Sequence, residues 1–331
     1  MTNPAARSSD AHAHLRQAAI RGSLAPSVHN TQPWRWRLDR SSLELIADRS
    51  RQLRVLDPTG RQLLISCGCA LFNARVSLAA AGVEPRVIRL PDPADQDLLA
   101  RIEFGAPGGP VEEGLRTLNP VVELRQTNRR RFADDEVPPE VLERLAAAAA
   151  AEDSELIVIN SAEHRLATAV LSQQADREEN ADPAYRAELR AWTSDDPRRR
   201  DGVPASAVPH VDAGAGDDIP IRDFDTRGTG WLPTATRSSM HQCLLLLAVT
   251  EDSEPAWLRA GEALQRLWLE ATRHGYAISL FTQVIEVPGT REELRSTLGI
   301  KSHPVVLLRV GRAPATASSH RRRIEDVLEE L

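Results

Sequence analysis

The chain has 331 residues, of which 41% are hydrophobic, and a formal net charge of −6, so it can bury a full core in one large or two ordinary domains. The acidic balance argues against a nucleic-acid-binding protein, and no stretch approaches the roughly 20 apolar residues that would span a membrane. Met1–Asp10 contains no secretory signal and the three cysteines form no disulfide framework, so we expect a cytoplasmic protein.

Residues 1–114 predict helices and strands on either side of a polar loop. The helical patterns cover Asp10–Gly22 and Arg61–Ala81, and the second of these is apolar around most of its circumference, which is typical of a helix buried against another helix. The predicted strands are Trp34–Leu38, Leu43–Ala47, Arg86–Leu90 and Arg101–Phe104. Gly105–Gly114, rich in proline and glycine, is the candidate linker to the rest of the chain.

Residues 115–331 predict a second set of elements. The predicted helices are Pro139–Ala151, Ala162–Trp192, Pro255–His274 and a short one over Arg321–Leu331, and the predicted strands are Leu156–Ile159, Cys243–Thr250 and Pro304–Val310. Thr193–Ser239 has no periodic pattern, and a connection of this length is either disordered or a lid over a site.

The loop after the first predicted helix contains two prolines, Pro26 and Pro33. Each fixes its own φ and favours extended geometry in the residue before it, so we expect the loop to hold one shape. Ser27, Asn30 and Gln32 then place donors and acceptors on a stiff loop, which suits the edge of a flat heteroaromatic ring. The alternative is a proline-rich turn whose polar groups satisfy only the local backbone.

A second polar segment begins at Arg125. Arg125, Thr127 and Arg129 place two guanidinium groups and a hydroxyl in one extended stretch, and the planar guanidinium matches phosphate oxygens in pairs. A solvated basic run is the alternative. A third basic stretch, Arg321-Arg322-Arg323 near the end of the chain, indicates by itself only the basic end of a helix.

The loop matches every fixed position of Pro-Ser-x-x-Asn-x-Gln-Pro-Trp and so resembles the FMN-contacting loop of flavin-dependent nitroreductases. The Arg-x-Thr-x-Arg segment resembles the phosphate-binding segment of those enzymes, and Gly275–Gln283 stands where they carry a turn that faces flavin N5, with Thr282-Gln283 in place of Glu-Gly. The resemblance implies an α+β, nitroreductase-like fold with mainly antiparallel sheets flanked by helices. It also implies FMN as cofactor, contacted by Pro26, Ser27, Val28, His29, Asn30, Gln32, Arg125, Thr127, Arg129, Leu280, Thr282, Gln283, Arg321 and Arg322.

The order of the motifs differs from that of a homodimeric nitroreductase, in which each subunit carries the phosphate segment first and the ring loop after it. Here residues 1–114 hold only the loop and residues 115–331 only the segment, so one site can be assembled and its mirror image cannot. The pattern resembles the Acg-type nitroreductase-like family, a fused pair of halves that keeps a single FMN. It implies two pseudo-symmetric halves equivalent to a homodimer, for which a monomer suffices.

The resemblance implies an NAD(P)H-dependent oxidoreductase that reduces a nitro compound or a quinone. The flavin would carry the redox chemistry, so no catalytic side chain is required, and the sequence shows no set with metal-ligand spacing. His29 either hydrogen-bonds near the ring or is bonded locally. The alternative function is an FMN-sequestering or storage protein with little turnover, because a lid formed by Thr193–Ser239 would block a nicotinamide ring. Neither a nucleic acid nor a membrane is expected as a partner.

Overall fold

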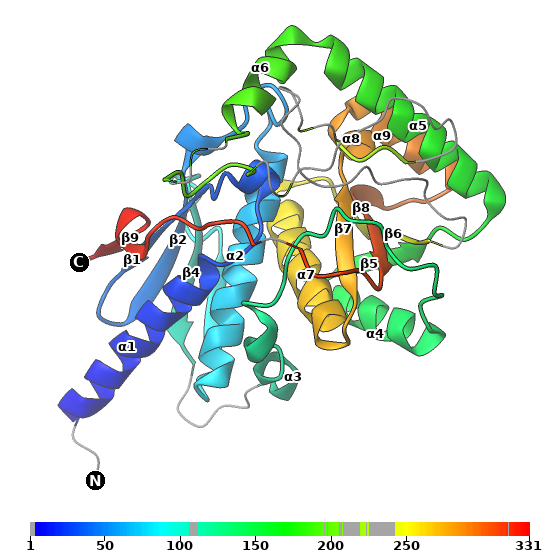
Figure 1. The fold of residues 1–331 in the computed structure, drawn as a ribbon. Coiled ribbons are helices and arrows are strands. Elements are labelled where there is room, and N and C mark those ends of the chain that lie inside the picture. Colours follow the sequence, from blue (N-terminus) through cyan, green and yellow to red (C-terminus); the bar gives the residue numbers. More distant parts are fainter. Residues whose placement is uncertain are drawn as a thin grey trace.

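The computed structural model describes residues 4–105, 112–194, 196, 198–204, 207, 219–222, 224, 242–316 and 318–331. Two long helices, α2 (Arg61–Ala80) and α7 (Glu254–Arg273), lie side by side at the centre, with a sheet on either side of the pair (Figure 1). Helix α1 (Pro4–Gly22) packs on α2, and the short α3 (Glu113–Arg116) also contacts it. The described part of the chain is therefore an α+β structure, as the sequence predicts.

The first sheet has the strand order β3-β4-β2-β1-β9. Strands β1 (Trp34–Leu38), β2 (Ser42–Ala47), β3 (Pro85–Arg89) and β4 (Leu98–Phe104) pair antiparallel, whereas β9 (Leu328–Glu330) runs parallel to β1 at the edge. In β1 every second side chain, Trp34, Trp36 and Leu38, is fully buried, as the two-residue period of a strand requires.

The chain end differs from the helix predicted over Arg321–Leu331. That prediction is wrong: a 3₁₀ turn over Ile324–Asp326 leads into β9. The amide of Trp36 donates to the Val327 carbonyl at 2.7 Å, and the amide of Leu331 donates to the Leu38 carbonyl at 3.0 Å. Pairing with an exposed strand edge overrides the weak local preference for helix. The division into halves at residues 114 and 115 stays a prediction, and β9 shows that the last residues complete the sheet formed near the start of the chain.

The second sheet has the order β5-β6-β8-β7, with all neighbours antiparallel: β5 (Ser154–Val158), β6 (Cys243–Val249), β7 (Ala277–Phe281) and β8 (His303–Gly311). Both faces are covered, which explains why β6 is a continuous apolar run. Leu245 and Leu247 join the core shared with α7 and α4 (Pro139–Ala150), whereas Leu244 and Leu246 join a second core. That second core contains side chains of α5 (Ala162–Ala181), α8 (Gln283–Glu286) and α9 (Pro288–Thr297).

The helix predicted over Ala162–Trp192 is interrupted, so that α5 is followed by a separate α6 (Pro183–Ala191). Asp182 caps the second helix by accepting from the amide of Ala184 at 2.8 Å, and proline occupies its first position. The predicted lid, residues 193–239, lies largely outside the described residues, as do residues 106–111 of the predicted linker.

The two central helices touch at glycines. A Cβ added to Gly68 would lie 2.1 Å from the Leu258 carbonyl oxygen, and one added to Gly261 would lie 2.0 Å from that of Ile65. Only glycine allows this approach. Contrary to expectation, α2 is long and apolar enough to cross a membrane, but 89% of its most apolar window is buried inside the protein, so the match is weak evidence for a span.

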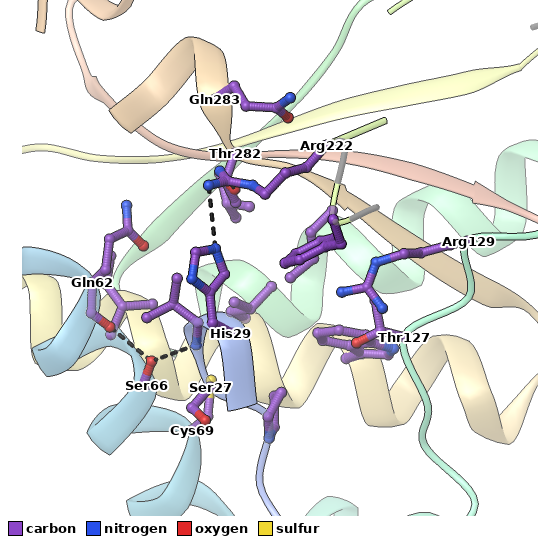
Figure 2. Close-up of a pocket in the computed structure, with 18 of the residues that line it drawn as sticks. Ser27, His29, Gln62, Ser66, Cys69, Thr127, Arg129, Arg222, Thr282 and Gln283 are labelled. Carbon is purple, nitrogen blue, oxygen red and sulfur yellow. Dashed lines mark hydrogen bonds between the residues drawn. The ribbon is translucent and has the colours of Figure 1, made fainter. Parts of the chain in front are cut away.

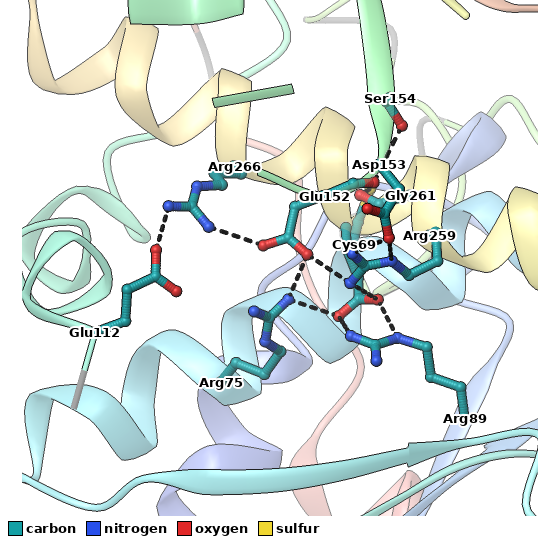
Figure 3. Close-up of polar contacts among 11 residues, drawn as sticks. Cys69, Arg75, Arg89, Glu112, Glu152, Asp153, Ser154, Arg259, Gly261 and Arg266 are labelled. Carbon is teal, nitrogen blue, oxygen red and sulfur yellow. Dashed lines mark hydrogen bonds and ion pairs between the residues drawn. The ribbon is translucent and has the colours of Figure 1, made fainter. Parts of the chain in front are cut away.

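A buried ion-pair network joins α2 and the first sheet to α7 and to the turn before β5 (Figure 3). The side chains of Glu152 and Glu262 are fully buried, and Arg75 donates to both at 2.8 Å. Arg89 makes a bidentate contact with Glu262 at 2.6 and 2.9 Å. Further arginines of α7, Arg259 and Arg266, donate to Glu152. Each buried carboxylate thus has several cationic partners, which compensates for its loss of hydration.

Candidate functional site

Two adjoining cavities lie where the Pro26–Gln32 loop meets the central helices and the Arg125–Arg129 segment. The first, here called the apolar compartment, has a volume of about 90 Å³. Many of the side chains that line it are apolar, among them Val28, Leu264, Leu280 and Val306. The second, the polar compartment, has a volume of about 220 Å³. The two share part of their lining, namely Pro26, Ser27, His29, Thr127 and Arg129.

The Pro26–Gln32 loop has an unusual backbone. His29, Asn30 and Gln32 have φ values of 46°, 55° and 51°, in the left-handed region that non-glycine residues rarely adopt. Hydrogen bonds hold this shape, because the Ser27 hydroxyl accepts from the Gln32 amide at 2.8 Å and the Ser66 hydroxyl accepts from that of Val28 at 3.2 Å. The loop is therefore fixed by its own polar groups and by α2.

Two of the predicted contacts line neither compartment. The Gln32 side chain accepts from the Arg322 amide at 2.7 Å, and the Arg322 guanidinium lies 3.7 Å from the Asp48 carboxylate. Both residues therefore stabilise the loop on the side that does not face the compartments. Arg321, by contrast, lines the polar compartment and donates to the side-chain oxygen of Asn30 at 3.1 Å.

His29 faces both compartments and is 5% exposed (Figure 2). Burial, followed by the charges of Arg222 and Arg129, lowers the pKa of His29 well below its usual value, so the imidazole is neutral. Its Nε2 lies 3.2 Å from an Arg222 nitrogen, which can only donate. The proton is therefore on Nδ1, which has no hydrogen-bond partner among the residues that the structure describes.

The Arg125–Arg129 segment lies beside β7, where the amide of Asn128 donates to the Ile278 carbonyl at 3.0 Å. Arg125 is 5% exposed, and its guanidinium lies 4.7 Å from the ring centroid of Trp268. Within the described chain its Nε and Nη1 have no hydrogen-bond partner. Burial, and then the charge of Arg321, lowers the pKa of Arg125 to about 9, and burial lowers that of Arg321 to about 10. The polar compartment thus has an excess of buried positive charge, which suits an anion.

Helix α2 contributes cavity residues that the sequence analysis did not identify. Gln62, Ser66 and Cys69 line the apolar compartment (Figure 2). Their spacing of four and then three residues places them on one helix face, which is the signal that could have found them. Burial raises the pKa of the Cys69 thiol to about 12, so this cysteine is not a thiolate at neutral pH.

Part of the predicted lid also reaches the cavity, since Ile221, Arg222 and Phe224 line the apolar compartment. Phe224 meets the His29 ring edge-on, with centroids 5.3 Å apart, and the Arg129 guanidinium lies 4.8 Å from its centroid.

Arg222 is held by side chains of α6 and α8 and by Thr282, which follows β7. Its guanidinium donates to the Tyr185 hydroxyl at 2.6 Å and the Thr282 hydroxyl at 3.0 Å, and it forms an ion pair with Glu286. Burial raises the pKa of the neighbouring Glu179 to about 8. Arg222 is therefore neutralised mainly by one carboxylate near neutral pH, and its charge is not available to a ligand in the way that of Arg125 is.

Comparison with known proteins shows the family of this chain. The family model described as the nitroreductase family matches residues 122–312. The Mycobacterium tuberculosis protein Rv3131, which carries the provisional name NAD(P)H nitroreductase, is 36% identical over 313 residues, covering 92% of this chain and 88% of that protein. The chain belongs to the nitroreductase family.

Another member of the nitroreductase family, the Mycobacterium tuberculosis protein Acg, also provisionally named NAD(P)H nitroreductase, is 32% identical over 321 residues, covering 95% of this chain and 94% of its own. The resemblance to the nitroreductase family and to Acg is thereby confirmed. Among solved structures, an FMN-bound nitroreductase from Desulfitobacterium hafniense is 14% identical, with a TM-score of 0.41, and covers 64% of this chain and 97% of that chain. Similarity at this level assigns no ligand or residue role.

Proposed function

We propose that this chain binds one FMN across the two compartments and acts as an NAD(P)H-dependent oxidoreductase on nitro compounds or quinones. The observation that carries the proposal is the junction of an apolar compartment with a buried polar one. In the polar compartment the Nε and Nη1 donors of Arg125 have no partner among the described residues of the chain. FMN has the same division, with a flat ring at one end and a phosphate at the other. The names of the relatives Rv3131 and Acg support the activity.

The residues present fit this cofactor. In the polar compartment Arg125, Arg129 and Arg321, with the hydroxyl of Thr127, would hold the phosphate through charge-assisted hydrogen bonds. In the apolar compartment the Nδ1–H of neutral His29 offers a donor to the edge of the ring.

The residues at the end of β7 are predicted contacts whose polar side chains have partners in the protein. The Thr282 hydroxyl is engaged by Arg222, and the Gln283 side chain donates to Asp176 at 3.0 Å. Both line the apolar compartment together with Leu280. We therefore assign any polar contact from this segment to its backbone.

When bound, FMN supplies two-electron redox chemistry between NAD(P)H and the acceptor. The protein's part is to bind the phosphate, orient the ring and exclude water from its edge.

A second function, FMN sequestration with little turnover, is favoured by one observation. Ile221, Arg222 and Phe224 line the apolar compartment, and Arg222 is tied down by several partners. A nicotinamide ring would have to pass or displace these side chains. Closing segments of this kind can also open during turnover, so binding and activity must be measured separately.

The first experiment titrates the purified, flavin-free chain with FMN. We expect one equivalent per chain, and binding of two equivalents at similar affinity would contradict the single composite site. Arg125→Met should weaken binding about tenfold to a hundredfold, since charge-assisted hydrogen bonds contribute roughly 1.5–3 kcal/mol and 1.4 kcal/mol corresponds to tenfold. The matched control is Arg131→Met, because Arg131 is 61% exposed and pairs with Asp134 at 3.5 Å.

The second experiment mixes the FMN-loaded protein with NADPH or NADH without oxygen. Rapid loss of the oxidised-flavin absorbance, followed by its return on adding a nitroaromatic or a quinone, is the result expected of an oxidoreductase. A bound flavin that neither nucleotide reduces would replace the first proposal by the sequestering function.

A further inference from the structure

Trp268 on α7 links the two compartments. It is 1% exposed and lines the apolar compartment, while the face of its ring carries the guanidinium of Arg125, which lines the polar compartment, at 4.7 Å. A cation over an indole ring at this distance is attracted by the negative face of the ring, and tryptophan is the aromatic residue that does this best.

The way in which Arg125 is held differs from that of Arg75 and Arg222. Arg75 donates to two buried glutamates and Arg222 pairs with Glu286, so their charges are neutralised and their donors occupied. For Arg125 the structure records no carboxylate partner in the described residues, and its Nε and Nη1 make no hydrogen bond there. An aromatic face attracts the charge without using an N–H group.

We propose that Trp268 is a positioning residue that orients Arg125 toward the phosphate, and that it thereby sets the preference of the site for FMN over flavins without a phosphate. This inference rests on the proposed FMN site. It adds a specificity role to a residue whose other visible role is to form the wall of the apolar compartment.

Riboflavin separates these two roles, because it shares the ring and side chain of FMN but lacks the phosphate. Loss of the wall weakens both ligands by the same factor. Loss of positioning weakens FMN alone. The informative quantity is therefore the ratio of the riboflavin Kd to the FMN Kd, measured on the full flavin-free chain by quenching of flavin fluorescence.

We expect Trp268→Leu to lower this ratio about tenfold, which corresponds to 1.4 kcal/mol, and Trp268→Phe to lower it about threefold. Trp257→Leu is the matched control: Trp257 lies on the same helix, and the Arg61 guanidinium lies 5.9 Å from its ring centroid, but neither residue lines a compartment. Its ratio should equal that of the wild type. Thermal unfolding of each variant identifies any that do not fold, and Trp268→Phe carries the test if Trp268→Leu fails.

A double-mutant cycle completes the test. In an Arg125→Met background, Trp268→Phe should leave the ratio unchanged, because there is no guanidinium left to orient. An unchanged ratio in folded Trp268 variants, or an equal fall with and without Arg125, would overturn the positioning role and leave the FMN site standing. Failure of the wild type to bind FMN would instead overturn the proposed function.

Discussion

We expect Arg125 to destabilise the flavin-free protein and to be useful only when a ligand is bound. Replacing Arg125 by methionine tests this expectation. The side chain is 5% exposed, and its Nε and Nη1 have no hydrogen-bond partner in the described structure. Methionine has a similar length and can keep the contact with the Trp268 ring through its thioether. The substitution therefore removes the charge with little change in packing.

The structure allows the size of the effect to be estimated. Burial and then the charge of Arg321 lower the pKa of Arg125 from 12.5 to about 9. At 1.36 kcal/mol per pKa unit this is roughly 5 kcal/mol against the charged form, from which a desolvated cation–π contact recovers about 2 kcal/mol. We expect the flavin-free Arg125→Met variant to be more stable by roughly 1–3 kcal/mol near neutral pH.

The sign of the pH dependence follows from the same pKa. Between about pH 9 and 12.5 the folded wild type binds fewer protons at Arg125 than the unfolded chain does, so this residue's contribution to stability rises with pH. Its destabilising effect is complete below about pH 9. The advantage of the methionine variant should therefore shrink as the pH rises above that value.

Urea unfolding of the flavin-free proteins measures the difference, with Arg321→Met as the matched control. Burial lowers the pKa of Arg321 less, to about 10, and this arginine donates to the Ala25 carbonyl and to the Asn30 side chain, both at 3.1 Å, so its loss should not stabilise the protein. Saturating FMN should remove most of the advantage of Arg125→Met, because binding that is tenfold to a hundredfold weaker stabilises the variant by roughly 1.4–2.8 kcal/mol less than the wild type. A flavin-free Arg125→Met protein less stable than the wild type would refute the reasoning.

Three further predictions concern stability. Glu262→Gln should lower the free energy of unfolding by about 3–5 kcal/mol, since it removes the fully buried carboxylate that Arg75 and Arg89 share. Glu123→Gln is the matched control: Glu123 is 66% exposed, so the change should be less than about 1 kcal/mol. Gly261→Ala should force the central helices apart and lower the free energy of unfolding by several kcal/mol, while Gly289→Ala, with nothing within 4 Å of an added Cβ, should be nearly neutral. Equal effects of the two substitutions in urea unfolding would contradict the close contact of the helices. The contribution of His29 to stability should fall as the pH drops below about 6.5, because the unfolded imidazole takes up a proton that the buried one does not. The stability of the wild type relative to His29→Gln should therefore fall over that range, and an NMR titration showing a protonated His29 ring at about pH 6 would exclude this account.

The predicted elements agree with the structure where the pattern is long and regular. The Arg61–Ala81 prediction matches α2 to within a residue, because eighteen residues of that helix are buried and its composition reflects this. The three residues of β9 carry no such pattern, and only the open edge of β1 makes them a strand. Likewise the loop was expected to be stiff from its prolines, but the left-handed backbone of His29 and Gln32 depends on hydrogen bonds to groups elsewhere in the fold.

The sequence by itself determined the family and the two motifs of the site, because the loop and the arginine segment are each continuous in the chain and keep their residue types and spacing. Only the tertiary structure decided that Arg321 rather than Arg322 faces the polar compartment, that Arg222 reaches the apolar one, and that Trp268 supports Arg125. These contacts join segments separated by long stretches of chain. Their geometry is set by how helices and sheets pack, and no local pattern of residues encodes it.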